Sequence, residues 1–324
     1  MITRLFLSFS LLFAFTGCGL KSLTKSPVDN VRCTEGNISF YMKGPQTPFK
    51  VLFLSDVHFT VEDERGRDFY KYSKRMGGSA VEPENYGLTN GRDEALRAAL
   101  DKAKREGVEM VILAGDIVNF PSLASVEWIK RILDESGLKW AYIAGNHDWH
   151  YEGEQGSSKQ LREKWTSTNL KPLYQGEDPM CYSRDIHGIN FVMIDNSTYE
   201  ISPEQLSFLR EEIAKGFPIV LSVHIPLYLP DRHVDFGCGH PDWNRAHDYI
   251  YEIESREPWP EEGHTHTTYD FCREVWDSPT VIAVFAGHIH HESLDIFKNT
   301  PQFVLGAAFE DSDCLIHFLP AGGQ

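Results

Sequence analysis

Residues 51–58, which read VLFLSDVH, are the stretch that decides the fold of this chain of 324 residues. The apolar run Val51 to Leu54 predicts a buried strand, and the metal-binding side chains Asp56 and His58 follow directly after it. Open α/β sheets hold their ligands and active sites at the carboxyl ends of their strands. The stretch therefore predicts an α/β fold whose chemistry lies at the end of this strand.

Four later segments repeat this arrangement of a strand-like run followed by polar groups. Each ends in a carboxylate, an amide oxygen or an imidazole, which are ligands for divalent metals. A single such segment occurs often by chance, whereas five in one chain point to a shared site. The set predicts a pocket for two metal ions. The four segments are Met110–Asp116, Trp140–Asp148, Ile219–His224 and Val281–His290.

The spacing within these segments has a mechanical reason. In extended chain, residues i and i+2 point to the same side of the strand. Asp56 and His58 are therefore expected to reach one ion together, and His288 and His290 to reach into the same pocket. A glycine precedes the polar residues in three of the segments and is expected to allow a sharp turn there.

In this order the segments resemble the calcineurin-like metallophosphoesterase superfamily, over approximately residues 48–318. Residues 223–227 (VHIPL) and 283–288 (AVFAGH) are most similar to its branch related to purple acid phosphatases. The resemblance implies an α/β fold of two packed mixed β-sheets flanked by helices, a four-layer sandwich. It also implies an enzyme, a metal-dependent hydrolase of phosphoric ester bonds.

The same resemblance assigns a role to each polar residue of the five segments. It implies a first metal, a second metal, a carboxylate that bridges them, and a histidine that faces the scissile phosphate without binding metal. In that order, these are Asp56, His58 and His290; Asn146, His224 and His288; Asp116; and His147.

The chain departs from better-known members of that superfamily at Asn119. True purple acid phosphatases have a tyrosine at this position and lack the equivalent of His58, so a coloured iron–tyrosinate centre is not expected. Protein phosphatases have an aspartate there, which orients the catalytic histidine. Asn119 is able to accept a hydrogen bond from His147, but it supplies no charge to raise the pKa of that histidine.

A dinuclear metal centre of this kind acts through charge. Two ions lower the pKa of a bridging water, which makes hydroxide available near neutral pH, and they neutralise phosphate oxygens. Iron, manganese and zinc all suit the mixed ligand set. The resemblance favours a phosphomonoesterase, and a phosphodiesterase with the same metal core is the alternative. A second alternative, a non-catalytic lipoprotein that binds a glycan or a partner, would be expected to have lost ligands, whereas every ligand position is filled.

The N-terminal residues predict an exported protein. Arg4 precedes the apolar run Leu5 to Phe15, which is too short to span a bilayer, because that requires about 20 residues. Residues 15–18 (FTGC) resemble a bacterial lipobox, so residues 1–17 are expected to be a signal peptide and Cys18 to be lipidated. An ordinary secretory signal with an incidental cysteine is the alternative. The expected location is the cell envelope, periplasmic or anchored at the outer membrane.

The rest of the chain divides into a tether and one domain. Residues 18–46 are expected to be a tether with one edge strand at residues 38–42, and residues 47–320 to form the metallophosphoesterase domain. The formal charge of −16 argues against a nucleic acid partner. A phosphorylated substrate and, through the lipid anchor, a membrane are the expected partners. Cys238 and Cys272 could form a disulfide bond in an oxidising compartment, or all the remaining cysteines could be buried thiols.

Two insertions, residues 60–90 and 228–279, interrupt the predicted domain. The first is rich in cationic residues, which either contact a phosphate or are solvated loop charges. The second contains five histidines, whose spacing matches no metal-binding motif, and three tryptophans that suit a lid or a substrate wall. The candidate phosphate contacts in the first insertion are Arg65, Arg67, Lys71, Lys74 and Arg75.

Apolar periodicity and turn residues predict the other elements. Helices are expected over residues 91–106 and 123–136, and a third is expected to begin at Ser202-Pro203 with a capping box. A hairpin is expected over residues 181–195, and the C-terminal part is expected to consist of strands.

Overall fold

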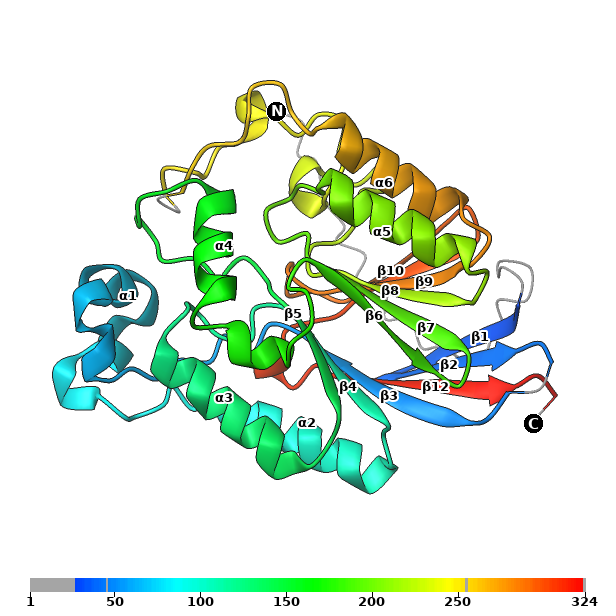
Figure 1. The fold of residues 1–324 in the computed structure, drawn as a ribbon, viewed down its shortest axis with the longest axis horizontal. Coiled ribbons are helices and arrows are strands. Elements are labelled where there is room, and N and C mark those ends of the chain that lie inside the picture. Colours follow the sequence, from blue (N-terminus) through cyan, green and yellow to red (C-terminus); the bar gives the residue numbers. More distant parts are fainter. Residues whose placement is uncertain (1–26, 45, 254–255, 323–324) are drawn as a thin grey trace, which may run out of the picture.

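The computed structural model describes residues 27–44, 46–253 and 256–322, so the predicted signal peptide and Cys18 lie outside the described residues. Two six-stranded mixed sheets pack face to face, and helices cover the outer face of each (Figure 1). The predicted α/β fold of two packed, helix-flanked sheets is thereby confirmed. Within the described ranges, no helix combines the length and the apolar character needed to cross a bilayer.

The first sheet contains the strand with which the sequence argument began. Its order is β1-β2-β12-β3-β4-β5, in which β3, β4 and β5 run parallel to one another and β12 runs antiparallel to β3. The parallel strands are joined by helices α2 (Asp93–Glu106) and α3 (Leu123–Ser136), which is the usual connection for parallel strands. The strands are β1 (Val28–Thr34), β2 (Asn37–Met42), β3 (Phe49–Leu54), β4 (Met110–Ala114), β5 (Trp140–Ile143) and β12 (Cys314–Pro320).

The second sheet has the order β10-β11-β9-β8-β7-β6, with β7, β8, β9 and β11 parallel and the two edge strands antiparallel. The predicted hairpin is the pair β6 and β7. The strands are β6 (Cys181–Ile186), β7 (Ile189–Ile194), β8 (Ile219–Ser222), β9 (Val281–Ala286), β10 (Ser293–Phe297) and β11 (Thr300–Val304).

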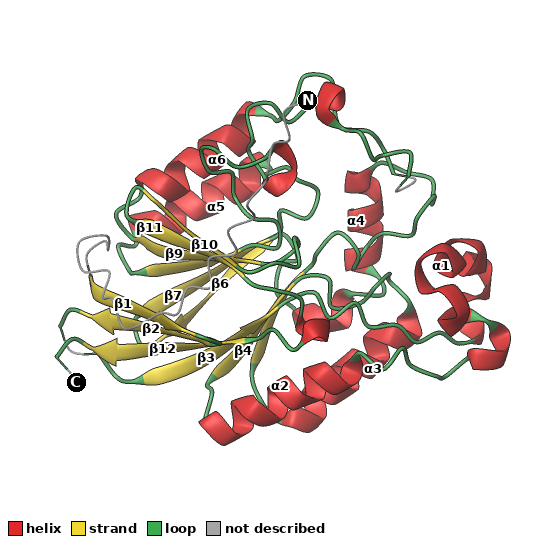
Figure 2. Ribbon diagram, turned by 180° about the vertical axis from the view of Figure 1, so that it is seen from behind, coloured by secondary structure: helices red, strands yellow, loops and turns green. Residues whose placement is uncertain are grey.

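Helices α2 and α3 lie against the first sheet, and α5 and α6 lie against the second (Figures 1 and 2). The predicted capping box is present at the start of α5, where Ser202 and Gln205 bond each other's backbone N–H groups. Helix α3 begins after the N-cap residue Ser122 and ends at Gly137, which adopts a left-handed conformation. The helices are α1 (Tyr70–Gly77), α2 (Asp93–Glu106), α3 (Leu123–Ser136), α4 (Ser158–Ser167), α5 (Pro203–Ala214) and α6 (His266–Asp277).

Aromatic side chains fill the space between the two sheets. Phe318 of β12 stacks on Phe40 and Phe49, with ring centroids 5.3 and 4.7 Å away, and meets Phe191 of the second sheet edge to face. Each fully buried phenylalanine contributes about 1.5–3 kcal/mol to the free energy of folding. This packing fixes the relative position of the sheets and so of the loops at their ends.

The predicted tether is wrong for residues 28–34, which form strand β1 and pair with β2 in a hairpin, whereas the strand predicted at residues 38–42 is present as β2. Strand β2 is not an edge strand, because it lies between β1 and β12 and pairs in parallel with the latter. The physical reason is its alternation, which directs Ile38, Phe40 and Met42 into the core between the sheets. Gly36, with a φ of 64°, makes the turn between the two strands.

The second predicted insertion is shorter than expected, because α6 lies within residues 228–279 and belongs to the helix layer of the second sheet. Among the described residues, all five cysteines are free thiols. Cys238 and Cys272 are both buried, and the Cys272 thiol donates to the carbonyl oxygen of Cys238 at 3.5 Å. In this structure the pair therefore packs as thiols instead of forming the disulfide bond considered above.

Candidate metal centre

The candidate ligands lie on loops at the carboxyl ends of strands from both sheets. Loops after β3, β4 and β5 supply residues from the first sheet, and loops after β8 and β9 supply residues from the second. Backbone hydrogen bonds tie neighbouring loops together: Asp56 N–H donates to Gly115 O at 2.9 Å, and Gly287 N–H donates to His224 O at 2.9 Å. The parallel arrangement brings these loops to one edge, as the sequence predicted.

The backbone at the candidate ligands is strained. Non-glycine residues seldom adopt positive φ, and each such residue costs about 1–3 kcal/mol. The extended geometry expected for the i and i+2 pairs is therefore wrong, since tight left-handed loops present those side chains instead of straight strand. Five candidate ligands are left-handed: Asp56 (φ 57°), His58 (48°), Asp116 (53°), His288 (72°) and His290 (56°).

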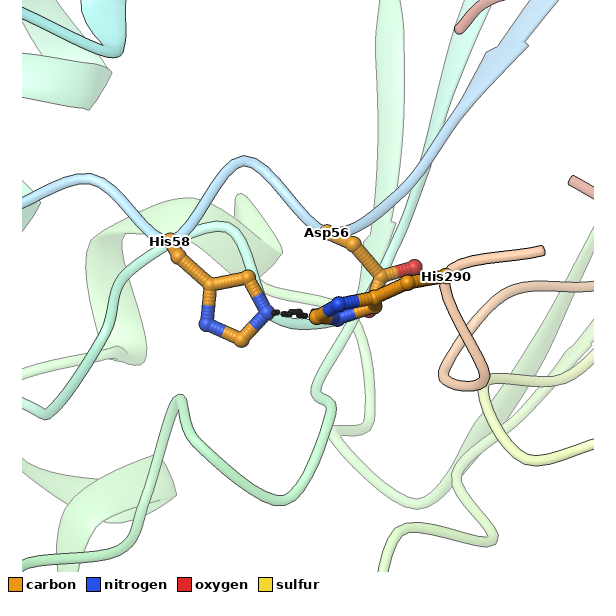
Figure 3. A group of neighbouring side chains, drawn as sticks. All are labelled: Asp56, His58 and His290. Atoms are coloured by element: carbon orange, nitrogen blue, oxygen red, sulfur yellow. Dashed lines mark hydrogen bonds and ion pairs between the residues drawn. The ribbon is translucent and has the colours of Figure 1, made fainter. Parts of the chain in front are cut away.

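The first group of ligand atoms belongs to Asp56, His58 and His290 (Figure 3). The two imidazole Nε2 atoms face each other at 3.1 Å, and Asp56 Oδ1 lies 3.4 Å from His290 Nε2 and 3.8 Å from His58 Nε2. All three ligand atoms lie within 4.8 Å of one another. Three ligand atoms that converge in this way are positioned to bind a cation.

The second group of ligand atoms belongs to Asp116, His224 and His288. Asp116 Oδ2 lies 3.2 Å from His224 Nε2 and also 3.8 Å from His58 Nε2, so this carboxylate lies between the two groups. His224 Nδ1 donates to Ala114 O at 2.8 Å, which directs its Nε2 toward the carboxylate.

The protonation of these histidines follows from their surroundings. Burial lowers the pKa of His58 to about 3 and that of His288 to about 4, so both are neutral imidazoles, the form that binds metal. Burial would also lower the pKa of His224, but the adjacent Asp116 carboxylate outweighs it and raises that pKa to about 10. The carboxylates thus attract positive charge into this pocket.

Several buried polar atoms of the pocket lack a hydrogen-bond partner among the described residues. They are Asp56 Oδ1, Asn146 Oδ1 and His224 Nε2. An unsatisfied buried polar group costs about 1–3 kcal/mol. Oxygen and imidazole nitrogen atoms oriented in this way fit bound divalent cations, which would satisfy all three. The donor set therefore suits a dinuclear centre.

Two of the predicted turn glycines serve the site through their lack of a side chain. A Cβ on Gly145 would lie 2.2 Å from Asp116 Oδ1, and a Cβ on Gly287 would lie 2.3 Å from Asp56 Oδ2. Only Gly115, the third, has a positive φ, of 90°. The prediction of a sharp turn is thus confirmed at Gly115. At the other two positions glycine is required because a neighbouring loop packs against the Cα atom.

His147 lies beside the two groups and is held by Asn119. The ring Nδ1 lies 3.1 Å from Asn119 Oδ1 and 3.2 Å from Asn119 O, so Nδ1 is the donor. Asn119 is oriented in turn, because its Nδ2 donates to Met76 O at 3.0 Å. The hydrogen bond that the sequence allowed is therefore present, and a residue of the first insertion fixes its direction. The ligand atoms of His147, His58 and Asp116 also lie close together.

Sequence reasoning missed two residues at this centre. Tyr199 places its hydroxyl 2.7 Å from His288 Nε2. Asp148, inside the predicted block but given no role, accepts hydrogen bonds from Gly145 N and Val118 N at 2.8 Å each. Burial raises the pKa of Asp148 to about 7. Tyr199 follows strand β7 at the same sheet edge as the candidate ligands, and this position in the sequence could have identified it.

The insertions contribute less to the centre than expected. Arg65 is bound by Asp63 and Glu127, and Lys74 is paired with Glu82, so these cations of the first insertion are already neutralised. Arg67 pairs with Glu64. Over the described part of the second insertion, no His, Cys, Asp or Glu residues form a group close enough to hold a metal. Its histidines pack and hydrogen-bond instead, as His264 does against Trp243 and Glu200.

The chain belongs to the calcineurin-like phosphoesterase family, whose sequence profile matches residues 49–292. It is 26% identical over 144 residues to a protein of Fibrobacter succinogenes described as a probable cyclic nucleotide phosphodiesterase, a match that covers 44% of this chain and 48% of that protein. It is 20% identical over 231 residues to a protein of Psychrobacter arcticus with the same description, covering 67% of this chain and 71% of that protein.

Two solved structures are also similar to this chain, at low sequence identity. A dimetal phosphatase from Danio rerio has a TM-score of 0.48 at 15% identity, with 81% of this chain and 88% of that chain covered. A purple acid phosphatase from yellow lupin (Lupinus luteus) has a TM-score of 0.47 at 14% identity, with 84% of this chain and 46% of that chain covered.

Proposed function

We propose that this chain hydrolyses phosphoric esters with the help of two metal ions. The observation that carries the proposal is the position of Asp116, whose Oδ2 faces His58 on one side and His224 on the other. A carboxylate between two groups of imidazole and carboxylate ligands is the arrangement expected of a dinuclear centre. Asp56, His58 and His290 would hold one ion, and Asn146, His224 and His288 the other. Iron, manganese and zinc all suit these ligands.

Bound in this way, two ions would activate a water molecule as the nucleophile and neutralise charge on the phosphate. The chain's own residues support the reaction by position. Asn119 holds the proton on His147 Nδ1, which leaves Nε2 to face the leaving oxygen. Asp148 fixes the loops that carry Asn146 and Asp116, because its carboxylate binds backbone N–H groups on both.

Phosphomonoesters are the substrate class that we propose first. A monoester carries more negative charge than a diester and is suited by a nearby cationic side chain. Phosphodiesters are the second candidate, and the descriptions of both sequence relatives as probable cyclic nucleotide phosphodiesterases favour them.

The proposal is tested on the purified full-length protein. We expect about two transition-metal ions per chain and hydrolysis of p-nitrophenyl phosphate or of its bis ester. Replacement of His147 by alanine should lower turnover at unchanged metal content. Protein that contains no metal, and that manganese, zinc or iron does not activate, would contradict the proposal.

We further propose that the protein is exported and anchored in the cell envelope through a lipidated Cys18. The support is the lipobox-like sequence FTGC at residues 15–18 after an apolar run. Cys18→Ser should move the protein from the membrane fraction to the soluble fraction. Membrane association that is unchanged in this variant would rule out the lipid anchor.

A further inference from the structure

Arg92 lies beside the first group of candidate ligands, although it was not among the cations expected to contact phosphate. Its Nη1 lies 3.5 Å from the carbonyl oxygen of His58. Asn90 fixes this position, because its Nδ2 donates to the same His58 oxygen at 2.9 Å and its Oδ1 accepts from the Arg92 N–H at 3.3 Å. Residues 90–92, at the end of the first insertion, are therefore hydrogen-bonded to the loop that carries the candidate ligand His58.

The guanidinium of Arg92 also rests on an aromatic ring that touches the ligands. Its central carbon lies 4.1 Å from the centroid of the Phe309 ring. That ring lies 5.3 Å from the ring of His290 and 5.8 Å from the ring of His58. Because such a contact uses the face of the guanidinium, the N–H donors in its plane are left for other partners.

Arg92 has no carboxylate partner among the described residues, although it is half-buried. The neighbouring Asp93 is engaged elsewhere, with the indole of Trp128 at 3.1 Å and with Arg97. In the first insertion Arg65, in contrast, is paired with carboxylates. A half-buried cation with no counter-charge is costly, and an anionic ligand beside it would offset that cost.

We propose that Arg92, supported by Phe309, binds a phosphate oxygen of the substrate on the side of the first metal and selects for the dianionic phosphate of a monoester. The inference rests on the proposed function, because it takes the two ligand groups as the place where the phosphate is held. The chemistry recognised is a terminal phosphate, and a diester, with one charge fewer, gains less from this contact.

The first test measures binding and does not require turnover. Full-length protein loaded with Mn²⁺ is titrated with inorganic phosphate by calorimetry, for wild type, Arg92→Met, Arg92→Lys and the control Arg67→Met. Arg67 is a suitable control, since it is a cation of the first insertion that pairs with Glu64 and whose side chain is 69% exposed. Loss of a charge-assisted hydrogen bond predicts about tenfold weaker phosphate binding for Arg92→Met, an intermediate loss for Arg92→Lys, and no change for Arg67→Met.

The second test compares two substrates in the same variants. For Arg92→Met, kcat/KM should fall about tenfold on p-nitrophenyl phosphate and by less than about threefold on the bis ester, at unchanged metal content and unfolding temperature. Phosphate affinity equal to that of wild type, or an equal loss on both substrates, would overturn the role of Arg92. If Arg92→Met binds phosphate more weakly than wild type while the wild-type protein hydrolyses neither ester, the result would support the role of Arg92 and refute the proposed function.

Discussion

Asp116 is the residue on which both ligand groups depend, since its Oδ2 lies within 4 Å of a histidine from each. Burial would raise the pKa of this carboxyl, but the nearby His224 and His147 outweigh it and hold the pKa well below its ordinary value. Asp116 is therefore ionised at neutral pH. Its charge is available to hold two cations.

We expect Asp116→Asn to weaken metal binding at least about 100-fold and to abolish hydrolysis, because an amide supplies neither the charge nor two oxygen ligands. Metal content after dialysis and turnover of p-nitrophenyl phosphate measure this. Asp101→Asn, on the exposed face of α2, is the matched control and should match wild type. A variant at position 116 with normal metal content and turnover would refute the bridging role.

Tyr199 acts on the centre through His288. Its hydroxyl lies 2.7 Å from His288 Nε2, and when Nε2–H donates to that hydroxyl, the lone pair of His288 Nδ1 would be the one to bind a metal. The ring of Tyr199 packs in turn on Trp243 and Trp259 of the second insertion, at 5.9 and 6.0 Å between centroids. Both tryptophans are buried. They therefore support Tyr199 and, through it, the candidate ligand His288, and they do not line an open wall of a substrate site.

Loss of this hydroxyl should loosen the ligand without unfolding the protein. For Tyr199→Phe we expect metal affinity to fall about tenfold, as is typical when a hydrogen bond to a metal-binding histidine is removed. Calorimetric titration with Mn²⁺ measures it. The control is Tyr228→Phe, because Tyr228 contacts a histidine that is not a candidate ligand, His240 of the second insertion. This variant should bind metal as wild type does. Equal affinities in all three proteins would show that Tyr199 does not position His288.

At the scale of elements, the sequence predicted helices α2 and α3 and the start of α5, but not α1, α4 or α6. Helix α2 buries Leu96, Ala99, Leu100 and Ala103 on one face, as their spacing indicates, and ends at Gly107. The left-handed loops that present the ligands could not be predicted in the same way. Their conformation is imposed by contacts between loops, such as the His288 N–H that donates to Asp56 Oδ2 at 2.9 Å, which join residues far apart in the chain.

Arg92 escaped prediction for a related reason. In the sequence it lies in the first turn of the amphipathic helix predicted over residues 91–106, and five other cations nearer to the Asp56 segment were the expected phosphate contacts. The structure pairs Arg65, Arg67 and Lys74 with acids and leaves Arg92 against His58. Charge pairing on a loop depends on its three-dimensional path, which composition does not reveal.

Glu200 connects the loop between β7 and α5 to the start of helix α6. Its carboxylate accepts from His264 Nδ1 at 3.1 Å, from Thr265 Oγ1 at 3.0 Å and from Thr268 Oγ1. Burial would raise the pKa of Glu200, but the hydrogen bonds from His264 and Thr268 outweigh it and lower that pKa below its ordinary value. The ionised carboxylate therefore stabilises the fold above the pKa of the unfolded state, and that stability is lost as pH falls through the folded pKa.

We expect Glu200→Gln to lower the free energy of unfolding by about 1–3 kcal/mol at pH 7, with the difference from wild type shrinking below about pH 4. Chemical denaturation at several pH values measures the effect. Glu211→Gln, at an exposed position of α5, is the control and should differ little from wild type. A deficit that is constant with pH would show that the charge of Glu200 is not the cause.

At the scale of the whole molecule, the centre joins the two sheets. Asp56, His58 and Asp116 come from the first sheet, whereas His224 and the segment His288–His290 come from the second. A cation bound by both sets would therefore oppose separation of the sheets. Any ligand that binds only the folded state stabilises it, by about 2.7 kcal/mol at 100 times its dissociation constant.

Removal of metal by a chelator should accordingly lower the unfolding temperature, and Mn²⁺ or Zn²⁺ should restore it. Differential scanning calorimetry of the same preparation before and after chelation provides the measurement. The Asp116→Asn variant should unfold at one temperature regardless of metal. An unfolding temperature that is indifferent to metal in wild type would argue against a centre shared between the sheets.

Strand β2 has a practical consequence for anyone who prepares this protein. It pairs along its whole length with β12, the last strand of the chain, from Leu315 opposite Asn37 to Pro320 opposite Met42. A recombinant fragment that starts at residue 47 would lack β2, so the backbone groups of β12 would lose these hydrogen-bond partners. The exposed sheet edge would favour self-association. The expressed protein should therefore begin at a residue before Val28.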